Sequence, residues 1–135
     1  MKSLSKLKKD LDTIFSIFIR LRYADDDGLV ICFTCQKKAH YKNGMQNGHF
    51  MSRKHLNTRF HEENCQVQCA GCNIFRYGEQ YKFSVNLDNE YGKGKSNELE
   101  ILSKQNEKFS RVDYDIKISY YKSLVDKIKK DKGIE

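Results

Sequence analysis

The sequence lacks proline, tryptophan and any long apolar run. No apolar stretch approaches the ~20 residues that a membrane-spanning helix needs, which excludes a transmembrane helix. The first residues also lack the apolar core and small-residue cleavage site of a secretory signal peptide, so we expect a cytoplasmic protein. With no low-complexity segment, repeat or linker, 135 residues predict a single domain with a modest core.

Acidic residues are absent from one long stretch of the chain. Residues 36–60 contain six lysines and arginines and no Asp or Glu, whereas the signs of charge are mixed elsewhere. The formal net charge of the whole chain is +7. A single-sign segment in an otherwise balanced protein indicates a surface that faces a polyanion, most often nucleic acid. A solvated loop with a chance bias in composition is the alternative.

The hydrophobic pattern predicts the α+β class, with an irregular centre between helical ends. Apolar residues at three- and four-residue steps predict amphipathic helices over 4–22 and 113–132. Asn97 and Glu100 have the spacing of a capping box. The other predicted elements are strands at 29–33, 47–51 and 66–68 and helices at 72–77, 79–91 and 97–104. We divide the single domain 1–135 into an N-terminal helix (1–28), a core (29–78) and a helical C-terminal part (79–135).

Four of the five cysteines form two pairs, Cys32-x2-Cys35 and Cys69-x2-Cys72. Two tight turns that each present two thiolates satisfy a tetrahedral ion, so the pattern predicts a structural Zn²⁺. Metal binding would also supply folding free energy to a polar segment. We expect Cys65 to be a small buried side chain, although it could compete through Cys65-x3-Cys69. A redox or regulatory CxxC protein remains an alternative.

Three polar residues follow an order that has catalytic meaning. A hairpin closed by zinc onto the helix that starts at Cys72 would bring His49, after Gly48, against the first turn of that helix, where Asn73 lies. His49 and Asn73 could then meet across a small cleft. With Asn64 between them, this is the His-Asn-Asn order of the ββα-metal (HNH-type) nucleases.

Several motifs together resemble the phage recombination nucleases of the NinG or Rap family. They are "FSIFIRLR" (15–22), "CFTC" (32–35), "NGHFMSRKHLNTRF" (47–60), Asn64, "QCAGCN" (68–73), "GEQYKFSVNL" (78–87) and "EYGKG" (90–94). The zinc pairs with Asn after the last cysteine also look like phage endonuclease VII. The resemblance implies a metal-dependent endonuclease that acts on branched or duplex DNA such as Holliday junctions and D-loops in phage recombination, leaving 5′-phosphate and 3′-hydroxyl ends. It places the protein in the bacterial host cytoplasm.

The resemblance implies a role for each polar residue. His49 would be the general base, Asn73 a ligand of catalytic Mg²⁺, for which Mn²⁺ may substitute, and Asn64 a brace for the hairpin. Many relatives carry Asp at the position of Gly48, so the second metal ligand is open. Its candidates are His61, Asn47 and Glu63.

We expect phosphate contacts from a cluster of basic side chains: Arg53, Lys54, Arg59 and Arg76. The later tyrosines and phenylalanines at helical spacing are predicted to be core residues rather than base-stacking groups. A homodimer is expected because symmetric resolution of a junction requires two nicks, and the C-terminal helix has an apolar face that could form it. The alternative function is a non-catalytic zinc module that binds nucleic acid through the same basic hairpin.

Overall fold

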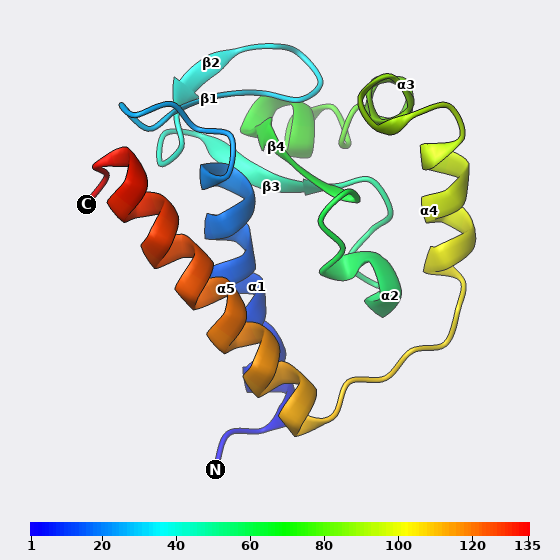
Figure 1. The fold of residues 1–135 in the computed structure, drawn as a ribbon. Helices are drawn as coiled ribbons and strands as arrows, with labels where there is room; N and C mark the ends of the chain where they lie inside the picture. Colours follow the sequence, from blue (N-terminus) through cyan, green and yellow to red (C-terminus); the bar gives the residue numbers. More distant parts are fainter.

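Five α-helices, one π-helical turn and four short strands make up the structure, a computed structural model that describes all 135 residues. Helices α1 and α5 lie side by side on one side of the molecule, α3 and α4 lie on the other, and β3 and β4 lie between (Figure 1). The elements are α1 (Leu4–Leu21), β1 (Leu29–Ile31), β2 (Lys38–His40), β3 (Met45–His49), α2 (Leu56–Arg59), β4 (Cys65–Cys69), η1 (Gly71–Phe75), α3 (Gln80–Tyr91), α4 (Lys95–Ser103) and α5 (Arg111–Lys132). The predicted α+β class is confirmed.

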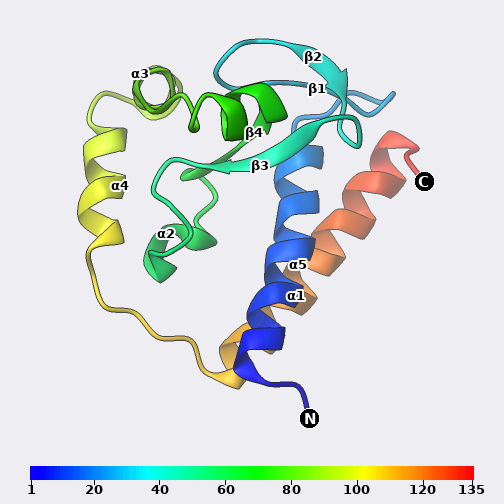
Figure 2. The ribbon, with the colours of Figure 1, turned by 180° about the vertical axis from the view of Figure 1, so that it is seen from behind.

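Helix α1 forms where the sequence predicts it, because its start is capped and its apolar residues share one face. The Ser3 hydroxyl accepts a hydrogen bond from the backbone N–H of Lys6 at 3.1 Å. The buried face packs on α5, as both views show (Figures 1 and 2). In that contact the rings of Phe15 and Tyr121 meet edge to face, with centroids 4.8 Å apart.

The apolar face of α5 on which the expected dimer was based is used inside the chain. Tyr121 and Val125 are buried, and Ile118, Leu124 and Ile128 pack against the same main core. That core also takes residues from α1 and from the strands, so the first and last helices share it with the centre of the chain. A dimer therefore requires another surface.

The four strands form two separate antiparallel pairs, β1 with β2 and β3 with β4. In the second pair His49, the last residue of β3, lies opposite Cys65, the first residue of β4. His49 thus ends a strand, and a connection over 50–64 that contains α2 follows it. The two strands lie within about two residues of their predicted positions.

The turn after β4 is a π-helix, shorter than the α-helix predicted over 72–77. Its backbone closes with a hydrogen bond from the N–H of Arg76 to the carbonyl of Gly71 at 2.9 Å. The chain then turns into α3 through Tyr77, Gly78 and Glu79, which all have positive φ angles. π-Helical turns occur often at functional sites.

A second, smaller core lies under α3 and α4. Phe83, Leu87 and Leu99 are buried, and Phe50 and Met51, the two residues after His49, pack against them. Phe83 is thus core, as predicted. Three other aromatic residues in this region do not fit that prediction, since the structure exposes Phe75, Tyr77 and Tyr81.

Capping differs from the prediction at α4. Its N-cap is Gly94, without a side-chain hydrogen bond, and Asn97 and Glu100 lie inside the helix. The capping box of this region is instead Ser110 with Asp113 at the start of α5. None of these helices combines the length and the apolar character that crossing a membrane would require.

Candidate functional site

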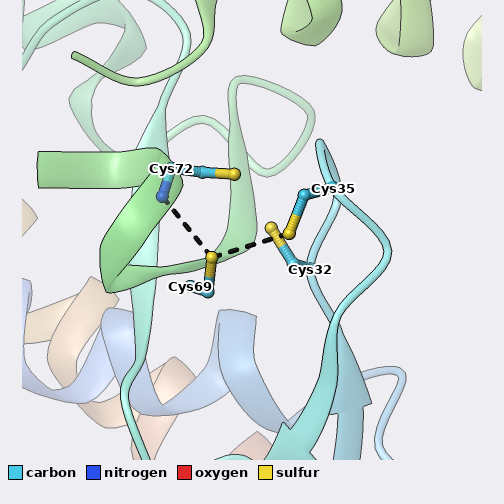
Figure 3. A group of neighbouring side chains, drawn as sticks. All are labelled: Cys32, Cys35, Cys69 and Cys72. Carbon is cyan, nitrogen blue, oxygen red and sulfur yellow. Dashed lines mark hydrogen bonds between the residues drawn. The ribbon is translucent and has the colours of Figure 1, made fainter. Parts of the chain in front are cut away.

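The four paired cysteines converge on one point, although they come from distant parts of the chain. Cys32 and Cys35 lie in the turn after β1, whereas Cys69 ends β4 and Cys72 lies in η1 (Figure 3). All four Sγ atoms lie within 4.8 Å of one another. Four sulfurs around one point fit a tetrahedral metal ion, and the cluster is consistent with a structural Zn²⁺. A redox pair would need only two of them.

Two hydrogen-bond donors lie against the sulfurs of Cys69 and Cys72. The backbone N–H of Cys72 donates to the Sγ of Cys69 at 3.4 Å. The guanidinium of Arg76 donates to the Sγ of Cys72 at 3.1 Å and lies 3.4 Å from the carboxylate of Glu79. Arg76 therefore contacts the cysteine cluster, and the phosphate contact expected for it stays a prediction.

Cys65 lies outside the cluster. It is fully buried, and its thiol donates to the backbone carbonyl of Arg59 at 3.4 Å. The prediction that Cys65 is a small buried side chain is confirmed. Burial raises the pKa of the Cys65 thiol, which keeps it protonated.

A cavity of about 630 Å³ lies beside the β3–β4–η1 unit. It contains both His49 from the end of β3 and Asn73 from η1. Helix α1 adds Asp12 and Ser16 to the wall, and the connection after β3 adds Arg53. The two residues that the sequence predicts to meet across a cleft thus share one cavity. Its wall is mostly polar, which suits a charged substrate better than an apolar ligand.

The ring of His49 is held in one tautomer. Its Nε2 lies 3.0 Å from the backbone carbonyl of Arg59. Because a carbonyl can only accept, Nε2 carries the proton in the neutral ring and Nδ1 is left as the acceptor. Burial lowers the pKa of His49 below its ordinary value of 6.5, against a smaller raising effect of the Arg59 hydrogen bond. His49 is therefore a neutral imidazole at pH 7.

The amide of Asn73 is oriented by a glutamine on the neighbouring strand. Its nitrogen donates to the Oε1 of Gln46 at 2.7 Å, and Gln46 lines the same cavity. With its nitrogen engaged, Asn73 has its Oδ1 free to accept a further partner. An amide oxygen is a ligand that hard cations such as Mg²⁺ accept. The sequence reasoning missed Gln46, because a glutamine in a short strand carries no signal of its own.

Asn64 lies at the base of the connection after His49. It is fully buried, and its Oδ1 accepts from the backbone N–H of Met51 at 2.8 Å. Its amide nitrogen donates to the carbonyls of Met51 and Thr58 at 3.1 and 3.0 Å. These bonds close the 50–64 connection on itself and hold the backbone next to His49.

Gly48 has no room for the acidic side chain that the resemblance to other ββα-metal nucleases leads one to expect there. A Cβ at Gly48 would lie 1.9 Å from the Oε1 of Gln68, a fully buried side chain on β4. Gln68 is fixed, because its nitrogen donates to the hydroxyl of Thr34 and the carbonyl of Gly78 at 3.0 and 2.9 Å. The packing of Gln68 against position 48 thus explains why that position holds glycine and not an acidic residue.

The three candidates for the second metal ligand separate clearly. Asn47 lines the cavity, and its Oδ1 is buried without a hydrogen-bond partner. His61 lies outside the cavity, and its Nδ1 accepts from the backbone N–H of Glu63 at 3.2 Å. Glu63 forms an ion pair with Lys95 of α4 at 2.9 Å. Only Asn47 therefore lies with His49 and Asn73.

Arg59 forms an ion pair that the sequence does not reveal. Its Nε and NH2 donate to the two carboxylate oxygens of Asp12 in α1 at 2.9 and 2.5 Å, and only 16% of its side chain is exposed. Its NH1 donates to the backbone carbonyl of Arg53 at 2.8 Å. Arg59 is thus engaged by Asp12 and by the backbone of Arg53, and the phosphate contact expected for it stays a prediction. Arg53 and Lys54 are exposed, and Arg53 lines the cavity.

The chain was compared with known families, curated proteins and solved structures. The family model described as "Bacteriophage Lambda NinG protein" matches residues 1–131. No curated protein and no solved structure gives a significant match.

Proposed function

The chain belongs to the NinG family, and from the cavity beside its cysteine cluster we propose that it is an HNH-type, metal-dependent endodeoxyribonuclease that acts on branched recombination intermediates. The observation that carries this proposal is the cavity shared by His49 and Asn73, in which His49 has one ring nitrogen free to accept a proton. The proposed reaction is hydrolysis of a DNA phosphodiester, giving a 5′-phosphate and a 3′-hydroxyl.

His49 acts as the general base. Its Nδ1 takes a proton from the water that attacks phosphorus, while the N–H at Nε2 stays on the carbonyl of Arg59. That carbonyl also stabilises the imidazolium that forms, since it lies 3.0 Å from the protonated Nε2. The lowered pKa of His49 keeps the base in its active form at neutral pH.

Asn73 would hold the catalytic cation through its Oδ1, because its amide nitrogen is engaged by Gln46. Mg²⁺, when bound, would neutralise the scissile phosphate and stabilise the departing 3′ oxygen. Mn²⁺ accepts the same oxygen ligands and should substitute. The protein supplies few ligands here, so phosphate and water oxygens complete the coordination.

A structural Zn²⁺ in the cysteine cluster positions this ligand. Cys72 and Asn73 are neighbours in η1, and Cys32 and Cys35 connect that turn to β1. A closed four-thiolate site has no open position for a substrate. The role of zinc is therefore to fix the backbone that carries Asn73.

DNA approaches the cavity along the basic segment. Arg53, which lines the cavity, and its neighbour Lys54 are both exposed, and the chain carries a net charge of +7. We assign phosphate contacts to these two side chains. Arg59 instead organises the site through Asp12.

A homodimer supplies the two nicks that symmetric resolution of a junction requires. The face of α5 that packs on α1 is occupied, but Val112, Ile116 and Tyr120 form a second set, spaced by four residues and 54 to 63% exposed. Residues four apart lie on one face of a helix. We assign the contact with the second copy to this stripe.

The rival function is a non-catalytic zinc module that binds nucleic acid. One observation favours it, since Gln68 fills the space of the acidic ligand at Gly48 and leaves mainly neutral oxygens around the cavity. Cleavage separates the two functions. The experiment incubates purified protein with end-labelled four-way junction, duplex and single-stranded DNA, with and without Mg²⁺. We expect Mg²⁺-dependent nicks at the junction, whereas binding without nicks under all conditions would support the rival.

A further inference from the structure

An exposed tyrosine lies at the mouth of the cavity that holds His49 and Asn73. Tyr77 lines this cavity and is 89% exposed, and Ile74, which also lines it, is 53% exposed. An exposed ring in the wall of a cavity lies where it can contact a molecule bound in that cavity. Both residues belong to the segment from η1 to α3, next to Asn73.

The backbone under Tyr77 is held in an unfavourable conformation. Tyr77 has a φ of 54°, and Gly78 and Glu79 follow with φ of 86° and 50°. A positive φ is a rare state for a bulky residue, and such states concentrate where function requires them. No hydrophobic contact of the main or the second core requires this tyrosine.

The segment is also fixed in place. The N–H of Gly78 donates to the carbonyl of Cys72 at 2.7 Å, and the carbonyl of Gly78 accepts from Gln68 at 2.9 Å. The ring is therefore presented by backbone that is tied to the cysteine cluster on one side and to β4 on the other. A ring carried on a fixed backbone loses only its own side-chain freedom when it stacks on a planar ligand.

We propose that Tyr77, with Ile74 beside it, is a platform that stacks on an unpaired DNA base next to the phosphate in the cavity. This inference rests on the proposed function of the same cavity and deepens it, because it names the feature of the substrate that the site reads. A base inside a duplex has no free face, whereas a branch point can present one. Every base has a π-face, so the contact is independent of sequence. The positive charge of Arg53, which lines the same cavity, complements the negative charge of the phosphates on either side of that base.

The test measures binding without Mg²⁺, so that it does not depend on cleavage. Its probes are a duplex with a short thymine bulge, the same duplex with an abasic bulge of equal length, and the fully paired duplex. The abasic bulge keeps the phosphates and the bend but lacks the bases. Wild-type protein should prefer the thymine bulge over the abasic bulge by about 5- to 150-fold, the range for one stacked base.

Tyr77→Gly should abolish this preference without loss of thermal stability, because glycine adopts a positive φ without strain. Tyr77→Asn, which also tolerates this conformation, is the second such variant, and Tyr77→Phe should keep the preference. Tyr81→Ala is the matched control, since Tyr81 is 81% exposed but does not line the cavity. It should bind all three probes as wild type does.

Three outcomes would overturn the platform. They are equal wild-type affinity for the two bulges, a preference that persists in Tyr77→Gly and Tyr77→Asn, and a loss of preference in Tyr81→Ala that equals the loss in Tyr77→Gly. Equal affinity for both bulges together with Mg²⁺-dependent cutting of a junction would refute the platform alone. Failure to bind any of the probes would refute both the platform and the proposed function.

Discussion

At His49, one backbone hydrogen bond decides which ring nitrogen can take a proton. The carbonyl of Arg59 holds the hydrogen on Nε2, and burial keeps the ring neutral near pH 7. Arg59 in turn is fixed by Asp12 from α1. The proposed base is thus oriented through Arg59, which Asp12 holds across 47 positions of the chain. The next two predictions test these residue-scale statements.

The pH dependence of cleavage should follow the lowered pKa of His49. Cleavage requires neutral His49, so the single-turnover rate should fall as the pH decreases, with its half-maximal point below 6.5, the ordinary value from which burial lowers this pKa. The charged groups that act on His49 are Asp12, Arg53 and Arg59. The same shift makes the free energy of unfolding depend on pH. The contribution of neutral His49 to stability is complete above the pKa that the residue has in the unfolded chain. It is lost as the pH falls through the lower pKa of His49 in the folded protein. A half-maximal rate at a pH above 6.5 would contradict this assignment.

Arg59 and Arg53 should respond differently to truncation. Arg59→Ala leaves the carboxylate of Asp12 without its partner, so we expect a loss of about 2 kcal/mol in the free energy of unfolding and slower cleavage. Arg53→Ala, at an exposed position, should keep its stability but weaken binding to all DNA sequences alike and flatten its salt dependence. Urea denaturation and binding at several salt concentrations measure both. The assignment of Arg59 would be wrong if its variant were stable and lost only DNA affinity.

At the scale of elements, the turn η1 joins the cysteine cluster to the cavity that holds His49 and Asn73. It carries Cys72 of the cluster and Asn73 of the cavity in adjacent positions. The other cysteine pair holds this turn against the end of β1. The removal of a metal ion or of a cysteine from the cluster should therefore also displace Asn73 in the cavity.

Zinc removal should unfold the centre of the molecule. A structural Zn²⁺ contributes on the order of 10 kcal/mol or more, comparable to the whole stability of a domain this size. Cys69→Ser should therefore lose zinc and ordered structure, whereas Cys65→Ala, which removes a buried thiol outside the cluster, should keep one Zn²⁺ per chain. Elemental analysis and circular dichroism check both variants. A chelator-washed wild-type sample that is folded and free of zinc would contradict the prediction.

The sequence predicts those elements whose signal is local. The periodicity of 4–22 and the two CxxC pairs are such signals, and α1 and the cysteine cluster agree with them. It misses features that no pattern of side chains encodes. Helix α4, for example, starts at Gly94 without a side-chain hydrogen bond, so its start depends on the backbone alone.

The same limit applies inside the site. That His49 and Asn73 share a cavity follows from the topology of two strands and a turn closed by cysteines. The pairing of Arg59 with Asp12, by contrast, depends on where α1 crosses the connection after β3, and no local pattern encodes it. The exposure of Tyr77 depends on three successive positive φ angles, which a helical pattern does not predict.

At the scale of the molecule, the first and last helices form one wall, and the strands and η1 lie between it and α3 and α4 (Figures 1 and 2). The cavity takes residues from the α1 side of this arrangement and from the turn after η1. The stripe of Val112, Ile116 and Tyr120 lies on α5 and does not contribute to the cavity. Two copies joined there would each keep an open site.

The dimer predicts a mass in solution of twice the 15.9 kDa of the chain. Ile116→Glu places a charge in the stripe and should give monomers, because a charged side chain is costly in the core of an interface. Lys122→Glu, on another exposed part of α5, is the matched control and should stay dimeric. Sedimentation with increasing protein concentration measures the difference. A wild-type monomer at all concentrations would refute the assigned dimer.

The central claim is that His49 is the base of a nuclease, and single-turnover cleavage of a bound junction tests it most directly. His49→Gln keeps a donor for the carbonyl of Arg59 but has no base, so it should retain fold, zinc and junction affinity while it cuts ~10²–10⁴-fold more slowly. Extra Mg²⁺ should not restore its rate. It should partly restore that of Asn73→Ala, which lacks a metal ligand rather than a proton acceptor. Near-normal cutting by His49→Gln would contradict the mechanism, because a group other than His49 would then have to accept the proton.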